Sequence, residues 1–294
     1  MTIKFDWNVK EKPEDFIVRE VAEHKFNEEG NFYLYRLIKK NLNTREVCED
    51  LNLSYAGLKD KNAITFQFIT SKQDLGEHLF KQISKDKFFI LSLIGKTSKK
   101  LKIGQLQGNY FSINLKSRNV SIKNSMINYF DTQRLSKNVE EGRKFFKNFK
   151  ISGKTRKKLK WKINFYIDAY LSYLWNKSFE IYLKERFSGY FLEENGHNFF
   201  IPEEIKTESL PKFWTILGYK VKLEESENYY RTILEKEGIS IEDLLEMLSV
   251  LRIKGDYRKS YINLSDVKLS GGYIHFFLPK GAYATMYLKH IFQT

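Results

Sequence analysis

The chain has 294 residues, of which 42% are hydrophobic and 16% aromatic, and it carries a formal net charge of +14. This length and apolar content indicate one large or two ordinary folded domains and exclude a disordered chain. The sequence contains no apolar run of about 18 residues and no basic, apolar leader, so we expect a soluble, cytoplasmic protein without membrane contact, and a monomer.

Helical and strand patterns alternate along the first half of the chain, which indicates a mixed α+β fold. Residues 43–51 (NTREVCEDL) start with a capping box between Asn43 and Glu46, which predicts a short helix. Residues 63–70 (AITFQFIT) alternate as in a strand. Asp60 therefore lies on the connection between a capped helix and a strand, where a scaffold can present a side chain rigidly.

The second half of the chain is expected to be largely helical from about residue 140 to residue 255. A strand is predicted at 109–117 before it, and the helices are predicted at 165–186 and 240–252, the latter with a capping box from Ser240 to Asp243. The aromatic side chains of 165–186 are expected to form core. A strand at 274–281 and a helix at 282–292 follow.

The positive charge is concentrated in the middle of the chain. Residues 51–200 carry 28 Lys and Arg against 12 Asp and Glu, whereas residues 201–250 carry 6 against 11. The densest stretch, residues 147–162, has eight cations and no acid. This asymmetry favours a polyanionic partner over a membrane surface, because the basic stretch lacks a wide apolar face. We expect RNA-backbone contacts from Lys154, Arg156, Lys157, Lys158 and Lys160.

The sequence gives no sign of a metal or a cofactor. Cys48 is the single cysteine, which excludes an internal disulfide and a cysteine-built metal site. The five histidines are scattered, and no phosphate-binding P-loop or dinucleotide fingerprint is present. We therefore expect chemistry that side chains perform alone.

Several motifs together carry a family resemblance. Residues 57–67 (GLKDKNAITFQ) match the pattern G-x-K-D-[KR]-x-A-x-T-x-Q, which resembles the signature of the TruD family of tRNA pseudouridine synthases. Four further segments resemble family motifs in the same order, at 10–20, 43–46, 101–115 and 278–291. A degenerate motif at 127–136 keeps Gln133 and Arg134, but Ile127, Asp131, Leu135 and Ser136 depart from the family pattern.

The resemblance implies a fold and a division of the chain. The fold is α+β: a pseudouridine synthase core of mixed, largely antiparallel sheet with flanking helices, interrupted by a helix-rich insertion. We expect the core at residues 1–135 and 256–294, and the insertion at 136–255.

The resemblance also implies roles for single residues. Asp60 aligns with the family's catalytic aspartate, and nearby lysines would favour its ionised form. Lys10 aligns with a lysine thought to pair with that aspartate, although Lys59 and Lys61 could do the same. Phe111 and Asn109 align with pocket positions beside the aspartate. A further set of expected substrate contacts comprises Tyr283, Gln133 and Arg134.

The function implied is isomerisation of uridine to pseudouridine in tRNA, with uridine 13 of the D arm as the family's site. Two alternatives stay open: a non-catalytic RNA-binding protein of the same fold, and a synthase acting on another RNA position. A nuclease is disfavoured, because it would need clustered carboxylates to hold metal ions and the basic half of the chain has few.

Overall fold

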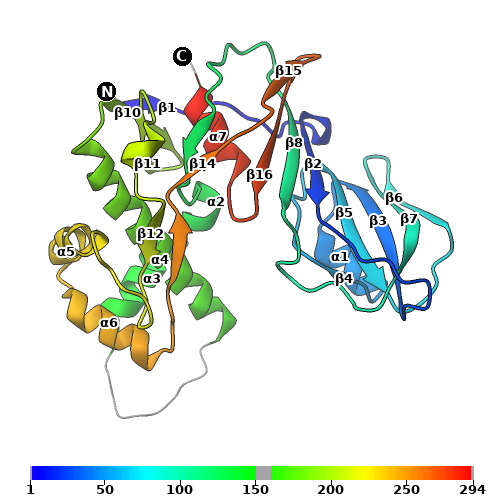
Figure 1. The fold of residues 1–294 in the computed structure, drawn as a ribbon, viewed down its shortest axis with the longest axis horizontal. Coiled ribbons are helices and arrows are strands. Elements are labelled where there is room, and N and C mark those ends of the chain that lie inside the picture. The colour runs from blue at the N-terminus through cyan, green and yellow to red at the C-terminus, as the bar shows by residue number, and fades with distance from the viewer. Residues whose placement is uncertain (1, 150–159, 293–294) are drawn as a thin grey trace.

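The computed structural model describes residues 2–149 and 160–292 and confirms an α+β fold. Figure 1 shows two lobes: strands β2, β3 and β5 to β7 with helix α1 form one, and helices α3 to α6 form the other, with β8, β15 and β16 between them. Segments that are far apart in the sequence lie side by side in this arrangement: β15 and β16 belong to the same sheet as β2 to β8. A site between the two lobes can therefore combine side chains from both.

The larger sheet is mixed and largely antiparallel, with strand order β15-β16-β8-β2-β5-β3-β7-β6 and β4 paired to β5. Only β2 and β5 run parallel within it. Its strands are β2 (Phe16–Val21), β3 (Phe32–Lys40), β4 (Ser54–Tyr55), β5 (Ile64–Ser71), β6 (His78–Ser84), β7 (Lys87–Thr97), β8 (Gly108–Asn114), β15 (Lys268–Ser270) and β16 (Tyr273–Pro279).

Helices and three small sheets make up the rest of the described chain. β1 pairs parallel with β10, so the N-terminal strand joins a sheet of the middle segment. The helices are α1 (Thr44–Asp50), α2 (Thr132–Leu135), α3 (Asn138–Asn148), α4 (Trp161–Lys184), α5 (Ser226–Glu237), α6 (Ile241–Val250) and α7 (Ala284–Ile291). The remaining strands are β1 (Thr2–Lys4), β9 (Ser125–Ile127), β10 (Gly189–Glu194), β11 (His197–Pro202), β12 (Phe213–Ile216), β13 (Asp256–Lys259) and β14 (Tyr261–Asn263).

The expectation of a largely helical segment from 140 to 255 is wrong in part. β10 and β11 form an antiparallel hairpin there, and β12 pairs with β13. The hairpin turns at Asn195 and Gly196, which both have positive φ, at 51° and 79°. An Asn-Gly pair is favoured in such turns because both residues adopt left-handed backbone angles at low cost. The division into 1–135, 136–255 and 256–294 stays a prediction.

The predicted helices and strands around the motif segments are confirmed. α1 begins with the Asn43–Glu46 capping box, and the Ser240 hydroxyl accepts a hydrogen bond from the Asp243 backbone N–H at 3.0 Å. In the first half of β5 the buried side chains are polar: Thr65 is 0% and Gln67 1% exposed. The alternation of this strand therefore places polar side chains inside the lobe, beneath the Asp60 loop.

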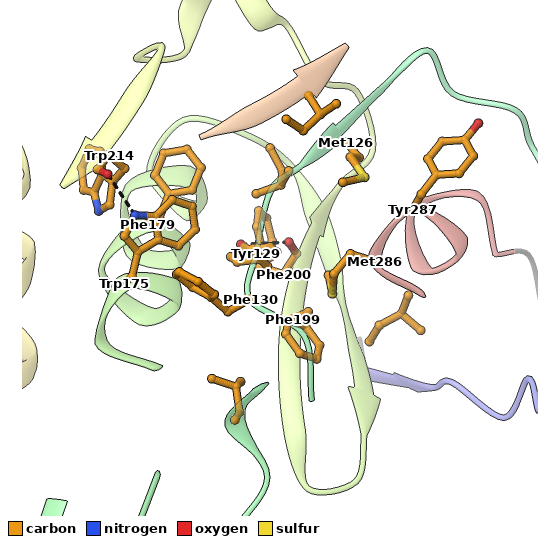
Figure 2. Close-up of a cluster of buried hydrophobic side chains, with 14 of the residues drawn as sticks. Met126, Tyr129, Phe130, Trp175, Phe179, Phe199, Phe200, Trp214, Met286 and Tyr287 are labelled. Carbon is orange, nitrogen blue, oxygen red and sulfur yellow. Dashed lines mark hydrogen bonds between the residues drawn. The ribbon is translucent and has the colours of Figure 1, made fainter. Parts of the chain in front are cut away.

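One large core holds the helical lobe together, and it is built from aromatic side chains, as expected for the helix at 165–186. Figure 2 shows Trp175 and Phe179 of α4 packed beside Trp214 of β12 and Phe130. The Trp175 indole N–H donates to the Trp214 carbonyl at 3.0 Å, so this polar atom is satisfied inside the core. A second, smaller core lies between α1 and strands β3, β5 and β7.

No helix within residues 2–149 and 160–292 has both the length and the apolar character needed to cross a membrane.

Candidate active site

Asp60 lies on the loop between β4 and β5, and buried polar side chains fix the shape of that loop. The Thr44 hydroxyl accepts from the Lys59 backbone N–H at 3.1 Å and donates to the Gln67 side chain at 2.8 Å. Gln67 in turn donates to the Gly57 carbonyl at 3.4 Å. The first turn of α1 and the buried face of β5 therefore hold the loop that carries Asp60.

Two lysines hold Asp60 itself. The Lys10 ammonium forms an ion pair with the Asp60 carboxylate, and the two side chains are 26% and 28% exposed. Lys10 is also placed by Phe16, since its nitrogen lies 4.2 Å from that ring's centroid. Lys39, fully buried on β3, donates to the Asp60 backbone carbonyl at 2.8 Å. The Asp60 carboxylate is thus oriented by Lys10 and remains partly exposed to solvent, while Lys39 holds the backbone of the same residue.

The other two candidate lysines do not pair with Asp60. The Lys59 side chain is 4% exposed and forms an ion pair with Glu20, whose side chain is 0% exposed. Lys61 is exposed. Among the three lysines considered from the sequence, the pairing partner of Asp60 is Lys10.

An open pocket of about 640 Å³ lies at Asp60. Its walls come from both lobes: α1 and the Asp60 loop on one side, and α2 and the start of α4 on the other. The lining includes Asp60, Lys59, Lys61, Gln133, Arg45 and Trp161. A carboxylate at the side of a pocket between two lobes can reach a group that enters from the surface.

Phe111 and Asn109 lie on β8 and are not among the residues that line this pocket. Phe111 is 6% exposed and packs against Phe276 and Phe16, with ring centroids 5.5 and 5.9 Å away. Asn109 stands opposite Glu20 in the ladder, and its side-chain oxygen is buried with no hydrogen-bond partner among the described residues. Phe111 therefore belongs to the core in this structure, whereas Asn109 keeps an unused acceptor.

The first residue of β8 is Gly108, at a position where no side chain would fit. A Cβ at this position would lie 2.2 Å from the Leu278 carbonyl oxygen of β16 and 2.5 Å from the Phe277 ring. Only glycine allows the two strands to approach this closely. The glycine of the Gly108-Asn109-Tyr110-Phe111 motif thus fixes the packing of the strand that carries both site candidates.

Tyr283 precedes α7 and lies beside Arg258. The Arg258 guanidinium is 6.0 Å from the Tyr283 ring centroid, and burial raises the pKa of the Tyr283 phenol. Arg258 donates to the carbonyls of Asn128 and Gly281, at 2.8 and 2.9 Å. It therefore ties two motif segments together, 127–136 and 278–291.

Gln133 and Arg134 lie on α2 and differ in their environment. Gln133 is exposed and lines the Asp60 pocket, whereas Arg134 pairs with Asp168 of α4 at 3.1 Å. Asp131, just before them, is 3% exposed and pairs with the fully buried Lys289 of α7 at 2.7 Å. Asp131, which departs from the family pattern, therefore takes part in a buried ion pair.

The expected RNA-backbone contacts fall mostly outside the described residues: Lys154, Arg156, Lys157 and Lys158. Lys160 is described, is exposed and precedes α4. Within the described ranges, no group of three or more His, Cys, Asp and Glu side chains is placed to hold a metal ion.

Sequence reasoning missed four residues that shape the site: Lys39, Glu20, Arg258 and Trp161. Lys39 lies in an apolar strand and Glu20 in a motif, and neither shows its partner locally. Arg258 lies three residues after Gly255, in a short polar stretch without a clear pattern. Only Trp161 had a usable signal, because it is an aromatic residue inside the basic run.

Comparison with known proteins adds independent evidence for the family. The model of the family described as tRNA pseudouridine synthase D (TruD) matches residues 4–149 and 154–291. The chain belongs to the TruD family. A tRNA pseudouridine synthase D from Aquifex aeolicus is 25% identical, with 98% of each chain covered. One from Nitratiruptor is 28% identical, covering 97% of this chain and 94% of the relative.

A solved structure supports the TruD fold. A crystal structure from Methanosarcina mazei assigned to TruD has a TM-score of 0.60 and 19% identity, and covers 96% of this chain and 92% of that one. The Aquifex TruD alignment runs over 382 positions, more than the 294 residues of this chain. The alignment therefore contains gaps opposite this chain. The relatives are named for tRNA pseudouridine synthesis, which is an isomerisation.

Proposed function

We propose that this protein converts uridine 13 in the D arm of tRNA to pseudouridine, with Asp60 as the catalytic carboxylate. The observation that carries the proposal is the placement of Asp60: an ion-paired, partly exposed carboxylate at a pocket between two lobes, in a member of the TruD family. A buried carboxylate could not reach a ribose, and an unheld one would not be oriented toward it.

The proposed reaction needs no redox step. The uridine N1–C1′ bond breaks and the uracil keeps its electron pair; the base rotates, and C5 bonds to C1′. The proton of C5 leaves and N1 gains one, so that substrate and product are isomers. Asp60 acts at the ribose as nucleophile or base. Lys10 orients the carboxylate, and Lys39 holds the backbone behind it.

The target uridine has to leave its stack before it can enter the pocket, at a cost of a few kcal/mol. Contacts with the tRNA backbone supply the affinity that offsets this cost. Exposed cations near the pocket suit that role: Lys61, Arg45 and Lys160.

The decisive experiment is Asp60→Asn with an unmodified tRNA transcript. We expect no pseudouridine signal in a carbodiimide primer-extension assay, while the dissociation constant for tRNA stays within about threefold, less than 1 kcal/mol. Turnover by Asp60→Asn at the wild-type rate would remove Asp60 from the mechanism. Absence of product with the wild-type protein, despite tight binding, would favour the non-catalytic RNA-binding alternative.

Two further measurements test the substrate. Pseudouridine mapping of total RNA from cells lacking the gene identifies the modified position, and loss at a site other than uridine 13 would correct that part of the proposal. Affinity for tRNA should also fall about 10³-fold between 50 and 200 mM salt if about six phosphates are contacted. A flat salt response would argue against backbone contacts.

A further inference from the structure

Trp161 is unusual among the tryptophans of this chain. It is the first residue of α4 and is 74% exposed, whereas Trp7, Trp175 and Trp214 are 4%, 0% and 2% exposed. Scattered exposed apolar residues are ordinary, so exposure alone indicates nothing. The surroundings of Trp161 are what give its exposure a meaning.

The indole ring is held in place, which distinguishes it from a loose surface side chain. It stacks on Phe165, one helical turn along α4, with ring centroids 5.6 Å apart and an interplanar angle of 15°. Residues at i and i+4 lie on the same helix face, so the helix itself supports this arrangement. Trp161 therefore presents an aromatic ring that Phe165 supports and that is largely exposed.

Trp161 lines the same pocket as Asp60 but comes from the other lobe. Leu58, which is 60% exposed, adds a second apolar wall to that pocket. Phe111, the aromatic expected to contact the base, is 6% exposed and packed between two other rings, so it has little surface to offer. Among the described residues that line this pocket, Trp161 is the one that offers an aromatic face to an entering base.

The charges beside Trp161 favour RNA over an apolar protein partner. Lys160 and Lys162, on either side of it in sequence, are both exposed, and Arg45 lines the pocket. An aromatic ring between cations is the arrangement with which proteins bind single-stranded nucleic acid: bases stack on the ring while phosphates contact the cations.

We propose that Trp161 stacks on an unpaired base of the tRNA strand that carries the target uridine, and so holds that strand at the Asp60 pocket. This inference rests on the proposed function for the identity of the RNA. Stacking on an aromatic side chain changes affinity enough that Trp161→Ala should weaken tRNA binding about 10- to 100-fold. Trp161→Phe keeps an aromatic face and should restore most of the affinity.

Fluorescence tests the contact without relying on activity. The other three tryptophans are buried, so quenching by acrylamide reports mainly on Trp161. The measurement uses Asp60→Asn protein and unmodified tRNA transcript, so that substrate binds without turnover. We expect tRNA to change the emission and to shield the indole from acrylamide, and we expect the Asp60→Asn/Trp161→Phe double variant to lose both signals while it still binds tRNA.

A matched control separates stacking from a general effect of removing an exposed ring. Phe80 on β6 is 60% exposed and packs beside Phe88, with centroids 6.1 Å apart, but does not line the Asp60 pocket. Phe80→Ala should leave tRNA affinity unchanged within about twofold. A circular dichroism melt of Trp161→Ala tests whether the variant is folded, and we expect a cooperative transition like that of the wild type.

The outcomes distinguish this inference from the proposed function. Unchanged affinity of Trp161→Ala, or an indole that saturating tRNA leaves fully open to acrylamide, overturns the stacking contact even if pseudouridine forms normally. Shielding of Trp161 in a wild-type protein that makes no pseudouridine supports the contact and rejects the catalytic proposal instead.

Discussion

Two lysine–aspartate pairs of the same chemistry occupy opposite environments in this molecule. The side chains of Lys10 and Asp60, in the sheet lobe, are 26% and 28% exposed, whereas those of Lys289 and Asp131, where α7 meets α2, are 0% and 4% exposed. The buried pair has further polar contacts: Thr285 donates to Asp131, and Lys289 also lies 3.0 Å from Glu194. In the exposed pair, Asp60 lines the pocket between the lobes, and Lys10 contacts Asp60.

The two environments suit the two pairs to different roles. A partly exposed pair is weakly stabilising, because water competes with it, so a substrate can replace one partner at little cost. A buried pair has lost its water, and the removal of one partner leaves an uncompensated charge in the interior. The Asp60 pair therefore suits exchange with a ligand, and the Asp131 pair suits the fixing of α2 against α7.

The free energy of unfolding should change most when the buried pair is broken. Asp131→Asn should lower the free energy of unfolding by about 3 kcal/mol, because within the described part of the chain Lys289 then keeps one charged partner, Glu194. The same isosteric change at the exposed pair, Asp60→Asn, should lower it by less than about 1 kcal/mol. Urea unfolding of both variants measures the difference. Equal losses at the two sites would show that exposure does not separate them.

A smaller effect is expected on catalysis at the exposed pair. Lys10→Met should lower pseudouridine formation about 10- to 100-fold, because a carboxylate without its partner spends less time in the productive geometry. Lys10→Arg should recover part of the rate. The control is Lys81→Met, since Lys81 forms an exposed pair with Asp50 at 2.7 Å on β6, away from the pocket lining. A Lys10→Met protein with the rate of Lys81→Met would contradict the orienting role.

Lys39 provides a prediction about pH. Burial lowers the pKa of its ammonium from 10.5 to about 8. Between these values the unfolded chain binds one more proton than the folded one, so the contribution of this group to stability rises with pH from about 8 to 10.5 and is lost as pH falls through 8.

Replacing Lys39 removes that pH dependence. Lys39→Met should make the increase in unfolding free energy from pH 7 to pH 9.5 smaller than in the wild type by about 1–2 kcal/mol. It should also lower pseudouridine formation severalfold, since the Asp60 carbonyl loses its donor. Parallel stability profiles for the two proteins would place Lys39 in a more polar environment than the structure gives it.

The sequence was sufficient for the local parts of this molecule. The capping box at Asn43, the strand after Asp60 and the helix after Gly281 follow from short-range patterns, and the structure confirms them. At Ser240 it confirms the hydroxyl cap but only half of the predicted capping box, since the described bond runs from the Asp243 backbone N–H to Ser240. The hairpin at Asn195 and Gly196 was missed, although an Asn-Gly pair between apolar runs is itself a hairpin signal.

Long-range pairing could not be predicted from the residues alone. Lys10 is 50 residues from Asp60, and Lys289 is 158 residues from Asp131. Alternation in β5 indicated two faces but not which one is buried, and Thr65 with Gln67 proved to face inward. Periodicity gives the geometry of a strand, whereas the packing of distant elements decides which partner each side chain meets.

The smallest expected effects compare the two helix caps of the two lobes. Asn43→Ala and Ser240→Ala should each lower the free energy of unfolding by about 1 kcal/mol, because each removes a capping side chain. Only Asn43→Ala should also slow pseudouridine formation, by about threefold to tenfold, since α1 holds Thr44 against the backbone of Lys59, the neighbour of Asp60. Asn43→Ser keeps a capping oxygen and should restore both properties. If Ser240→Ala slowed the reaction as much as Asn43→Ala at equal stability, the rate would follow general stability, and the α1 cap would have no special part in positioning Asp60.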